Sequence, residues 1–217
     1  MSLTDQLSER RNNSAKVIPE AKRSIMLKST ADLKSQHLSE KALKTGQILP
    51  PFTLKYIEGN DVSLEHFKSQ FLVISFYRGG WCPYCNMELK ALQNILPELT
   101  ALNSELIAIT PETPDNSLTT LEKNELTFAV LSDIDNTYAK SLGLVFQLPE
   151  DLQGVYKDFG IEVDKHNGNN DFELPMPATY IVNKDREVIY SFVPEDYTER
   201  LEPETILEVI KNQNEKP

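Results

Sequence analysis

The apolar positions of the chain recur with two different spacings, and these spacings predict strands and helices in alternation. Residues 71–76, 105–110 and 128–131 are short continuous apolar runs of the kind that form buried strands. After the first run, apolar side chains recur at helical spacing, at Met87, Leu89, Leu92, Ile95, Leu96 and Leu99. This spacing predicts a helix over residues 83–102, in which Pro97 is the place where a kink would occur.

The C-terminal part continues this alternation. Two apolar runs, 179–182 and 188–192, flank a polar stretch and predict a β-hairpin. Residues 161–175, rich in Asn around Gly168, predict a mobile surface loop. Further helices are expected over 118–124, 132–142 and 203–212, with one more helical turn between 149 and 160. The resulting order predicts an α/β protein with a central mixed β-sheet flanked by helices on both faces.

The first 45 residues have a different pattern, which predicts a helical extension. Over residues 3–43 the apolar side chains are scattered at roughly helical spacing, and strand-like alternation is missing. Pro19 is expected to open the first strong helix, and Thr30 or Asp32 to cap a second.

A proline pair at 50–51 then ends the helical character of the chain. Residues 52–54 and 62–64 are apolar segments on either side of the turn 58–61, which predicts a first hairpin. At 217 residues the chain is long enough for one α/β core plus an extension and short for two full domains. We therefore expect a helical N-terminal extension over 1–45 and a catalytic domain over 46–217.

The charge of the chain is unevenly distributed. The net charge of −11 argues against a surface for nucleic acid or anionic membranes, because both require clustered cations. Residues 1–45 hold nine Lys and Arg and five Asp and Glu, a net of +4, which leaves −15 on the other 172 residues. A basic extension on an acidic body is expected to pack intramolecularly or across a homodimer.

Hydropathy also predicts where the protein resides. The apolar stretches are all well short of the ~18 residues that span a bilayer. The start of the chain has neither the basic nor the apolar region of a secretory signal. We therefore expect a cytoplasmic protein with no membrane partner.

Both cysteines of the chain, Cys82 and Cys85, follow the first apolar run and begin the long helix. At this position the sulfur of Cys82 lies at a helix N-terminus, where unpaired backbone N–H groups favour an anion. Cys82 is therefore expected to be a thiolate near neutral pH. A disulfide that closes so short a loop stabilises a fold very little, so the value of the pair lies in its reactivity.

Two distant motifs give the chain a family resemblance. Trp81-Cys82-Pro83-Tyr84-Cys85 after a strand, together with Pro177-Ala178-Thr179-Tyr180 before the late hairpin, resembles the thioredoxin superfamily. Phe76-Tyr77-Arg78-Gly79-Gly80, Ile109-Thr110-Pro111-Glu112 and Leu174-Pro175-Met176 are similar to segments of its peroxiredoxin-like branch, the AhpC/TSA (alkyl hydroperoxide reductase/thiol-specific antioxidant) family. The resemblance covers roughly residues 46–210 and implies a thioredoxin-like fold.

The resemblance also implies roles for residues around the cysteines. Pro177 matches a proline that has a cis peptide bond in thioredoxin-fold enzymes and lies against the Cys-x-x-Cys turn, with Pro175 as the alternative. Apart from the resemblance, Trp81 is expected either to pack beside the turn with one face left for a partner or to be a core residue. A tight turn through Gly80 would expose backbone N–H groups to substrate.

The chain departs from the family pattern at two points. Typical peroxiredoxins carry Thr or Ser three residues before the reactive cysteine, where this chain has Gly79. They also supply an arginine from the strand where this chain has Pro177. Direct peroxide reduction would therefore need another donor, for which Arg78 and the local backbone N–H groups are the candidates.

These residues suggest a dithiol mechanism. Cys82 is expected to attack a peroxide oxygen or an oxidised sulfur, after which Cys85 resolves the adduct as an intramolecular disulfide. Glu88, three positions after Cys85, is a candidate proton acceptor. No cofactor is expected, and the partner would be an external thiol reductant such as thioredoxin or glutathione. The substrate, a peroxide or a disulfide of a protein or a small molecule, stays open.

Other functions fit the same motif. Cys-Pro-Tyr-Cys is also typical of dithiol glutaredoxins, so a protein that binds glutathione or an iron–sulfur cluster, with little peroxidase activity, is the main alternative. A redox-regulated adaptor that binds partners through the basic extension is another. A closed zinc site is disfavoured, because it needs two ligands beyond the two cysteines and His37, His66 and His166 are widely scattered.

Overall fold

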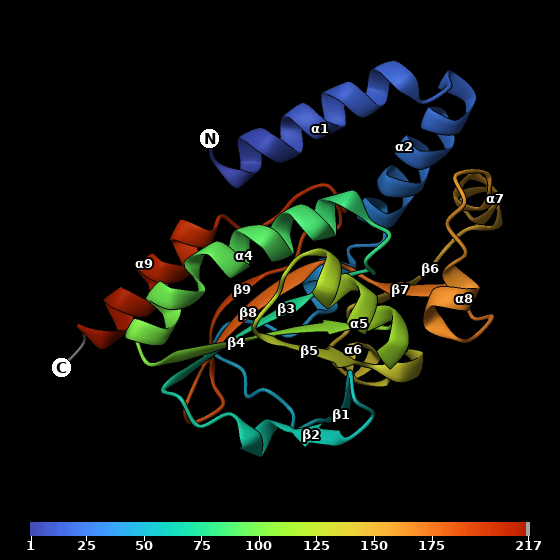
Figure 1. The fold of residues 1–217 in the computed structure, drawn as a ribbon. Helices are drawn as coiled ribbons and strands as arrows, with labels where there is room; N and C mark the ends of the chain where they lie inside the picture. The colour runs from blue at the N-terminus through green and yellow to red at the C-terminus, as the bar shows by residue number, and fades with distance from the viewer. Residues whose placement is uncertain (216–217) are drawn as a thin grey trace.

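A mixed β-sheet forms the centre of the molecule in the computed structural model, which describes residues 1–215 (Figure 1). Within these residues the sheet has seven strands in the order β2-β1-β5-β4-β3-β8-β9. β3 is parallel to β4 and β4 to β5, whereas β8, β9, β1 and β2 join in antiparallel pairs. The strands are β1 (Thr53–Tyr56), β2 (Asp61–Ser63), β3 (Phe71–Phe76), β4 (Ser104–Thr110), β5 (Ala129–Ser132), β8 (Ala178–Asn183) and β9 (Val188–Phe192).

Strand β3 shows why both faces of the sheet are covered. All six of its side chains are buried, and the five apolar ones are divided between two apolar clusters. Phe71 and Val73 face the cluster beneath α4 (Pro83–Ala101) and α9 (Pro203–Asn214). Leu72 and Ile74 face the cluster formed with α6 (Thr137–Ser141) and residues of the 42–52 segment. A strand buried on both sides reads as a continuous apolar run, which is how the sequence presents it.

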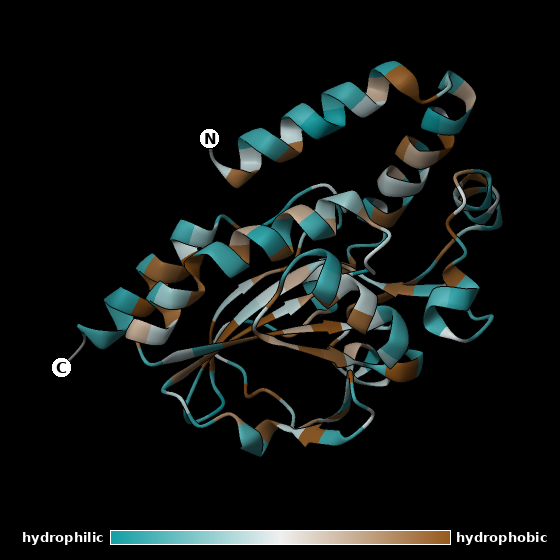
Figure 2. Cartoon of the chain, viewed as in Figure 1, coloured by the Kyte–Doolittle hydropathy of each residue, from teal (hydrophilic) through white to brown (hydrophobic). Residues whose placement is uncertain are grey.

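Three helices make up the N-terminal extension: α1 (Leu3–Val17), α2 (Glu20–Ser35) and α3 (Leu38–Lys41). α1 runs over α4, and α2 turns back beside α7 (Glu150–Asp158) toward the end of the sheet (Figure 1). Figure 2 shows that α1 and α2 are largely hydrophilic with isolated apolar turns. Two of these turns are anchored, since Leu3 and Leu7 are buried against α4 and α9.

The helix start expected at Pro19 was confirmed, but the start expected at Thr30 or Asp32 was wrong, and a helix ahead of Pro19 was not predicted. The first helix begins at Leu3, because Ser2 and Asp5 form a reciprocal capping box ahead of it. Pro19 precedes α2, the second helix, and Thr30 and Asp32 lie inside α2. Thr30 cannot act there as an N-cap, because its hydroxyl donates to the carbonyl of Met26 one turn earlier.

The predicted mobile loop over 161–175 was also wrong. This segment forms α8 (Val163–Asn167) and β7 (Glu173–Pro175), and β7 pairs with β6 (Val145–Gln147) in a small two-stranded sheet. It is ordered because Val163 and Leu174 are buried in an apolar cluster with α7. The pairing joins segments far apart in the sequence, so no local pattern signals it.

The other helices differ from the predictions mainly at their ends. α4 continues through Pro97, and α5 (Pro114–Lys123) begins one turn earlier than expected. The helix expected over 132–142 is divided into a 3₁₀ turn, Ile134–Asn136, and α6. The Asp133 carboxylate caps α6 by accepting the backbone N–H groups of Tyr138 and Ala139 in the first turn of that helix. Within the described residues, no helix is both long and apolar enough to cross a membrane.

Candidate active site

The two cysteines lie where β3 gives way to α4. Cys82 is the N-cap of α4, Pro83 is the first residue of the helix and Cys85 lies in its first turn. Proline is favoured at this place because its missing N–H would be unpaired in any case. Both residues are free cysteines and are buried, with 1% of Cys82 and none of Cys85 exposed.

The turn that precedes Cys82 depends on two glycines. Gly79 has a φ of +152°, and a Cβ there would meet Nε1 of Trp81 at 2.3 Å. A Cβ on Gly80 would lie 1.8 Å from Oγ1 of Thr120. The Gly80 N–H donates to the buried carboxylate of Glu112 at 2.8 Å. The turn is therefore tied to the loop that follows β4.

The pKa values of the two thiols are shifted in opposite directions. Burial by itself raises the pKa of Cys82, but a hydrogen bond from Cys85 and the positive charges of Arg78 and Arg200 lower this pKa from 9.0 to about 5. Burial raises the pKa of Cys85 well above the ordinary thiol value, and donation of its proton toward Cys82 adds to this rise. The resting dithiol therefore carries its negative charge on Cys82 and its proton on Cys85.

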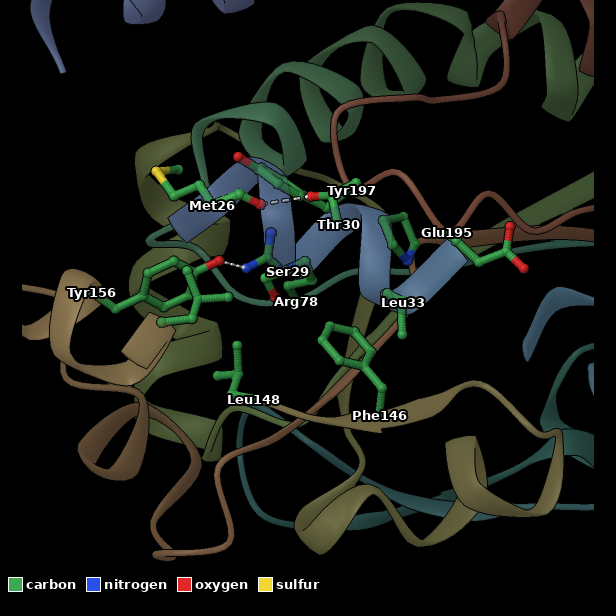
Figure 3. Close-up of a pocket in the computed structure, with 12 residues that line it drawn as sticks. Met26, Ser29, Thr30, Leu33, Arg78, Phe146, Leu148, Tyr156, Glu195 and Tyr197 are labelled. Carbon is green, nitrogen blue, oxygen red and sulfur yellow. Dashed lines mark hydrogen bonds between the residues drawn. The ribbon is translucent and has the colours of Figure 1, made fainter. Parts of the chain in front are cut away.

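The structure places Arg78, a candidate from the sequence, close to this thiolate. Only 2% of the residue is exposed, and its guanidinium lies against three aromatic rings. The guanidinium carbon is 4.9 Å from the centre of the Trp81 ring and 4.6 Å from that of Tyr197, and the group donates to the Tyr156 hydroxyl (Figure 3). Aromatic faces stabilise a cation that water does not reach. The Arg78 charge therefore stays fixed beside Cys82.

Sequence reasoning missed a second arginine, Arg200. Its Nη2 donates to Sγ of Cys85 at 3.1 Å, and its Nε donates to the carboxylate of Glu88. Its Nη1 donates to the carbonyls of Tyr197 and Glu199. Arg200 lies in the loop before α9, 115 positions after Cys85, so no spacing in the sequence could have identified it.

Glu88 lies one turn beyond Cys85 on α4, as expected from the sequence. Burial raises the pKa of its carboxyl from 4.5 to about 7, in spite of the opposing charge of Arg200. A carboxyl with this pKa can exchange a proton near neutral pH. Glu88, the candidate proton acceptor, is therefore one of the buried side chains that surround Cys85.

Pro177 lies near the turn, but its geometry differs from the expectation. It lines a narrow cavity of about 20 Å³ together with Arg78, Tyr197 and residues of α2 (Figure 3). The Met176–Pro177 peptide bond is trans, so the expected cis bond was wrong. Met176 and Pro177 join β7 directly to β8, and the Met176 N–H donates to the carbonyl of Leu144.

The N-terminal extension forms one side of this cavity. Met26, Ser29, Thr30 and Leu33 of α2 face Arg78 across it (Figure 3). The volume of the cavity is that of about one water molecule. Helix α2 therefore packs against the side of the site where Arg78 lies, with room for about one water molecule between them.

A family comparison decides the relationship of this dithiol to known proteins. The model of the AhpC/TSA family matches residues 45–191. The chain belongs to the AhpC/TSA family. Its relatives in the AhpC/TSA family include a chloroplastic peroxiredoxin Q from Sedum lineare, 28% identical over 172 residues, which cover 77% of this chain and 80% of the relative.

A second relative is named for a different activity. The thiol-disulfide oxidoreductase ResA of Bacillus thuringiensis is 24% identical over 164 residues, or 75% of this chain and 78% of that protein. Peroxiredoxins and thiol-disulfide oxidoreductases are thus both homologues of this AhpC/TSA chain, at low identity.

The fold is also shared with solved structures. The crystal structure of peroxidoxin BcpB from Mycobacterium tuberculosis superposes with a TM-score of 0.62 at 18% identity, over 78% of this chain and 97% of that one. The predicted thioredoxin-like α/β fold, with its mixed sheet, flanking helices, N-terminal helices and late hairpin, is confirmed. Within residues 1–215 of this AhpC/TSA protein, no cluster of three or more His, Cys, Asp or Glu side chains could hold a metal ion.

Proposed function

We propose that the protein is a thiol-dependent antioxidant oxidoreductase in which Cys82 is the nucleophile and Cys85 the resolving residue. The unequal acidity of the two sulfurs carries this proposal. An ionised Cys82 can attack at neutral pH, whereas the neighbouring Cys85 stays protonated during this first step. Two interchangeable thiols would not divide the steps in this way.

The reaction proceeds in two steps. The Cys82 thiolate attacks the outer oxygen of a hydroperoxide, which forms a sulfenic acid and releases an alcohol or water, or it attacks a disulfide and forms a mixed disulfide with release of a thiol. Cys85 then attacks the sulfur of Cys82 and forms the intramolecular disulfide. An external thiol reductant, such as thioredoxin or glutathione, returns the pair to the dithiol.

The burial of the site favours small oxidised substrates. The cysteines are 1% and 0% exposed, so the disulfide of a folded protein reaches Cys82 only after the surrounding chain moves. A hydroperoxide or a low-molecular-weight disulfide needs a much smaller opening. Arg78, fixed beside Cys82, supplies a positive charge, which typical peroxiredoxins obtain from an arginine where this chain has Pro177.

A direct comparison of substrates tests this proposal. The reduced protein is assayed for consumption of hydrogen peroxide and an alkyl hydroperoxide, and in parallel for reduction of insulin disulfides, with Cys82→Ser as the control. We expect peroxide consumption that exceeds insulin reduction and is lost in Cys82→Ser. Insulin reduction without peroxide consumption would contradict the peroxidase part of the proposal, and activity that persists in Cys82→Ser would contradict the nucleophile.

A further inference from the structure

The guanidinium of Arg200 links Cys85 to Glu88 in the interior of the protein. Its Nη2 lies 3.1 Å from Sγ of Cys85, and its Nε donates to the Glu88 carboxylate. Two backbone carbonyls, of Tyr197 and Glu199, accept from Nη1 at 2.8 and 2.7 Å. Every nitrogen of the guanidinium therefore has an acceptor, and one of these acceptors is a reacting sulfur.

The stability of the fold does not by itself explain why Arg200 and Glu88 are buried as an ion pair. The side chains of Arg200 and Glu88 are 1% and 2% exposed. A buried ion pair contributes little net stability, because the cost of removing both charges from water offsets their attraction. The pair does, however, hold a permanent positive charge in one orientation against Cys85, and water cannot screen it there.

We infer that Arg200 is a catalytic residue of the resolving step, in which it stabilises the thiolate of Cys85 as this thiolate attacks Cys82. Glu88 is the positioning residue that orients the guanidinium. The inference rests on the proposed function, because it takes Cys85 to be the resolving thiol.

The arrangement makes the negative charge pass from one sulfur to the other. In the resting dithiol the charge belongs to Cys82, and Cys85 keeps its proton. When Cys82 becomes a sulfenic acid or a mixed disulfide, its charge disappears, and so does the acceptor that kept Cys85 protonated. Arg200 then faces a single ionisable sulfur, and its positive charge favours loss of the Cys85 proton.

The step balances in atoms and electrons. The Cys85 thiolate forms a bond to the sulfur of Cys82, and the bond from that sulfur to oxygen, or to the substrate sulfur, breaks. Cys85 is oxidised in both cases: the sulfenic sulfur of Cys82 is reduced to the disulfide level, or, in a mixed disulfide, the departing substrate sulfur is reduced to the thiol. The proton lost by Cys85 leaves with the departing group, as water from a sulfenic acid or as a thiol from a mixed disulfide.

A small symmetrical disulfide separates the two steps experimentally. 4,4′-Dithiodipyridine releases one thiopyridone when Cys82 attacks and a second when Cys85 resolves the mixed disulfide. Stopped-flow absorbance therefore records two phases with wild-type protein. We expect Arg200→Met to slow the second phase about tenfold or more, to raise the pH at which this phase is half-maximal, and to change the first phase less than about threefold.

Three further variants serve as controls. Arg200→Met/Glu88→Leu removes both charges, so folding is preserved if the single variant is unstable with Glu88 left unpaired. Arg200→Lys keeps a cation and is expected to recover part of the second-phase rate. Arg186→Met removes an exposed arginine that pairs with Glu65 on the surface, and it is expected to leave both phases unchanged.

The outcomes distinguish this inference from the proposed function. If folded Arg200→Met and the double variant both keep the wild-type second phase and its pH dependence, the role of Arg200 is refuted while the dithiol mechanism stands. Equal slowing of the two phases would likewise refute a role specific to resolution. If the wild type itself releases only one thiopyridone, Cys85 does not resolve the adduct and the proposed function fails.

Discussion

Arg78 lies with its guanidinium carbon 4.6 Å from the centre of the Tyr197 ring, and this contact joins the turn before Cys82 to the segment over residues 195–202. The same segment holds the N-terminal extension at both ends. Asp196 pairs with Lys34 at the end of α2, and Glu202 accepts the N–H of Leu3 at the start of α1. One segment of the chain therefore supports the dithiol and fastens the helices that cover it.

Replacement of Arg78 is expected to raise the pKa of Cys82. In the wild type this pKa is about 5, with Arg78 among the groups that lower it. Removal of a cation in direct reach of a buried thiolate raises the pKa of the thiol by about 1–3 units. We expect the ultraviolet thiolate absorbance of reduced Arg78→Met to titrate at a correspondingly higher pH, with Arg78→Lys in between. Identical titrations of wild type and Arg78→Met would rule out this electrostatic role.

The free energy of unfolding of the reduced protein should rise with pH between the pKa of Cys82 in the folded protein, about 5, and its ordinary value of 9.0. The folded pKa of Cys82, about 5, lies below the ordinary value of 9.0, so the unfolded chain binds the extra proton between these limits. The thiolate therefore stabilises the fold above that range, and this contribution is lost as the pH falls toward 5.

Comparison with Cys82→Ser isolates this effect. Urea unfolding of both proteins under reducing conditions is expected to show a free energy difference that grows from about pH 5 to about pH 8, with a slope of at most about 1.4 kcal/mol per pH unit. A difference that shrinks with rising pH would contradict the assignment of the charge to Cys82.

A methyl group at Gly80 is expected to destabilise the protein. It would collide with the Thr120 hydroxyl oxygen at 1.8 Å, and overpacking of this kind costs about 1–3 kcal/mol. Gly154, in α7, has open space at the same position, so Gly154→Ala is the matched control and is expected to stabilise its helix by about 0.5–1 kcal/mol. Denaturant unfolding measures both effects. The Thr120→Ala substitution should relieve part of the Gly80→Ala cost, and equal effects at the two glycines would contradict the account of the turn.

The N-terminal extension should contribute to the stability of the whole protein. Leu7 of α1 is 4% exposed and belongs to the cluster beneath α4 and α9. Leu7→Ala is expected to lower the free energy of unfolding by about 2–5 kcal/mol, whereas Leu27→Ala, at a residue that is 60% exposed, should change it by less than about 0.5 kcal/mol. A Leu7→Ala loss no larger than that of Leu27→Ala would show that α1 is not packed into the core in solution.

Local patterns predicted much of the fold. The run at 71–76 and the helical spacing after Pro83 are properties of neighbouring residues, and each became the element expected, β3 and α4. Cys82 at the start of α4 follows from the same pattern. Arg78 could be singled out because it is next to the motif.

Contacts between segments that are distant in the sequence could not be predicted from local patterns. The pairing of β6 with β7 joins segments that local polarity does not connect, and the predicted loop over 161–175 was wrong for this reason. Arg200 carries no signal of its own, since an arginine in an acidic stretch is usually an exposed residue. Only the folded chain shows that it reaches Cys85.

The division of roles between the two cysteines is the central claim, and single-cysteine variants test it most directly. Reduced Cys85→Ser and Cys82→Ser are each treated with a stoichiometric amount of a hydroperoxide or a small disulfide, and the intact proteins and their peptides are examined by mass spectrometry. We predict that Cys85→Ser accumulates one adduct on Cys82, a trappable sulfenic acid or a mixed disulfide, while Cys82→Ser stays unmodified over the same time. Equal modification of Cys85 in Cys82→Ser, or no adduct on Cys82 in Cys85→Ser, would contradict the account.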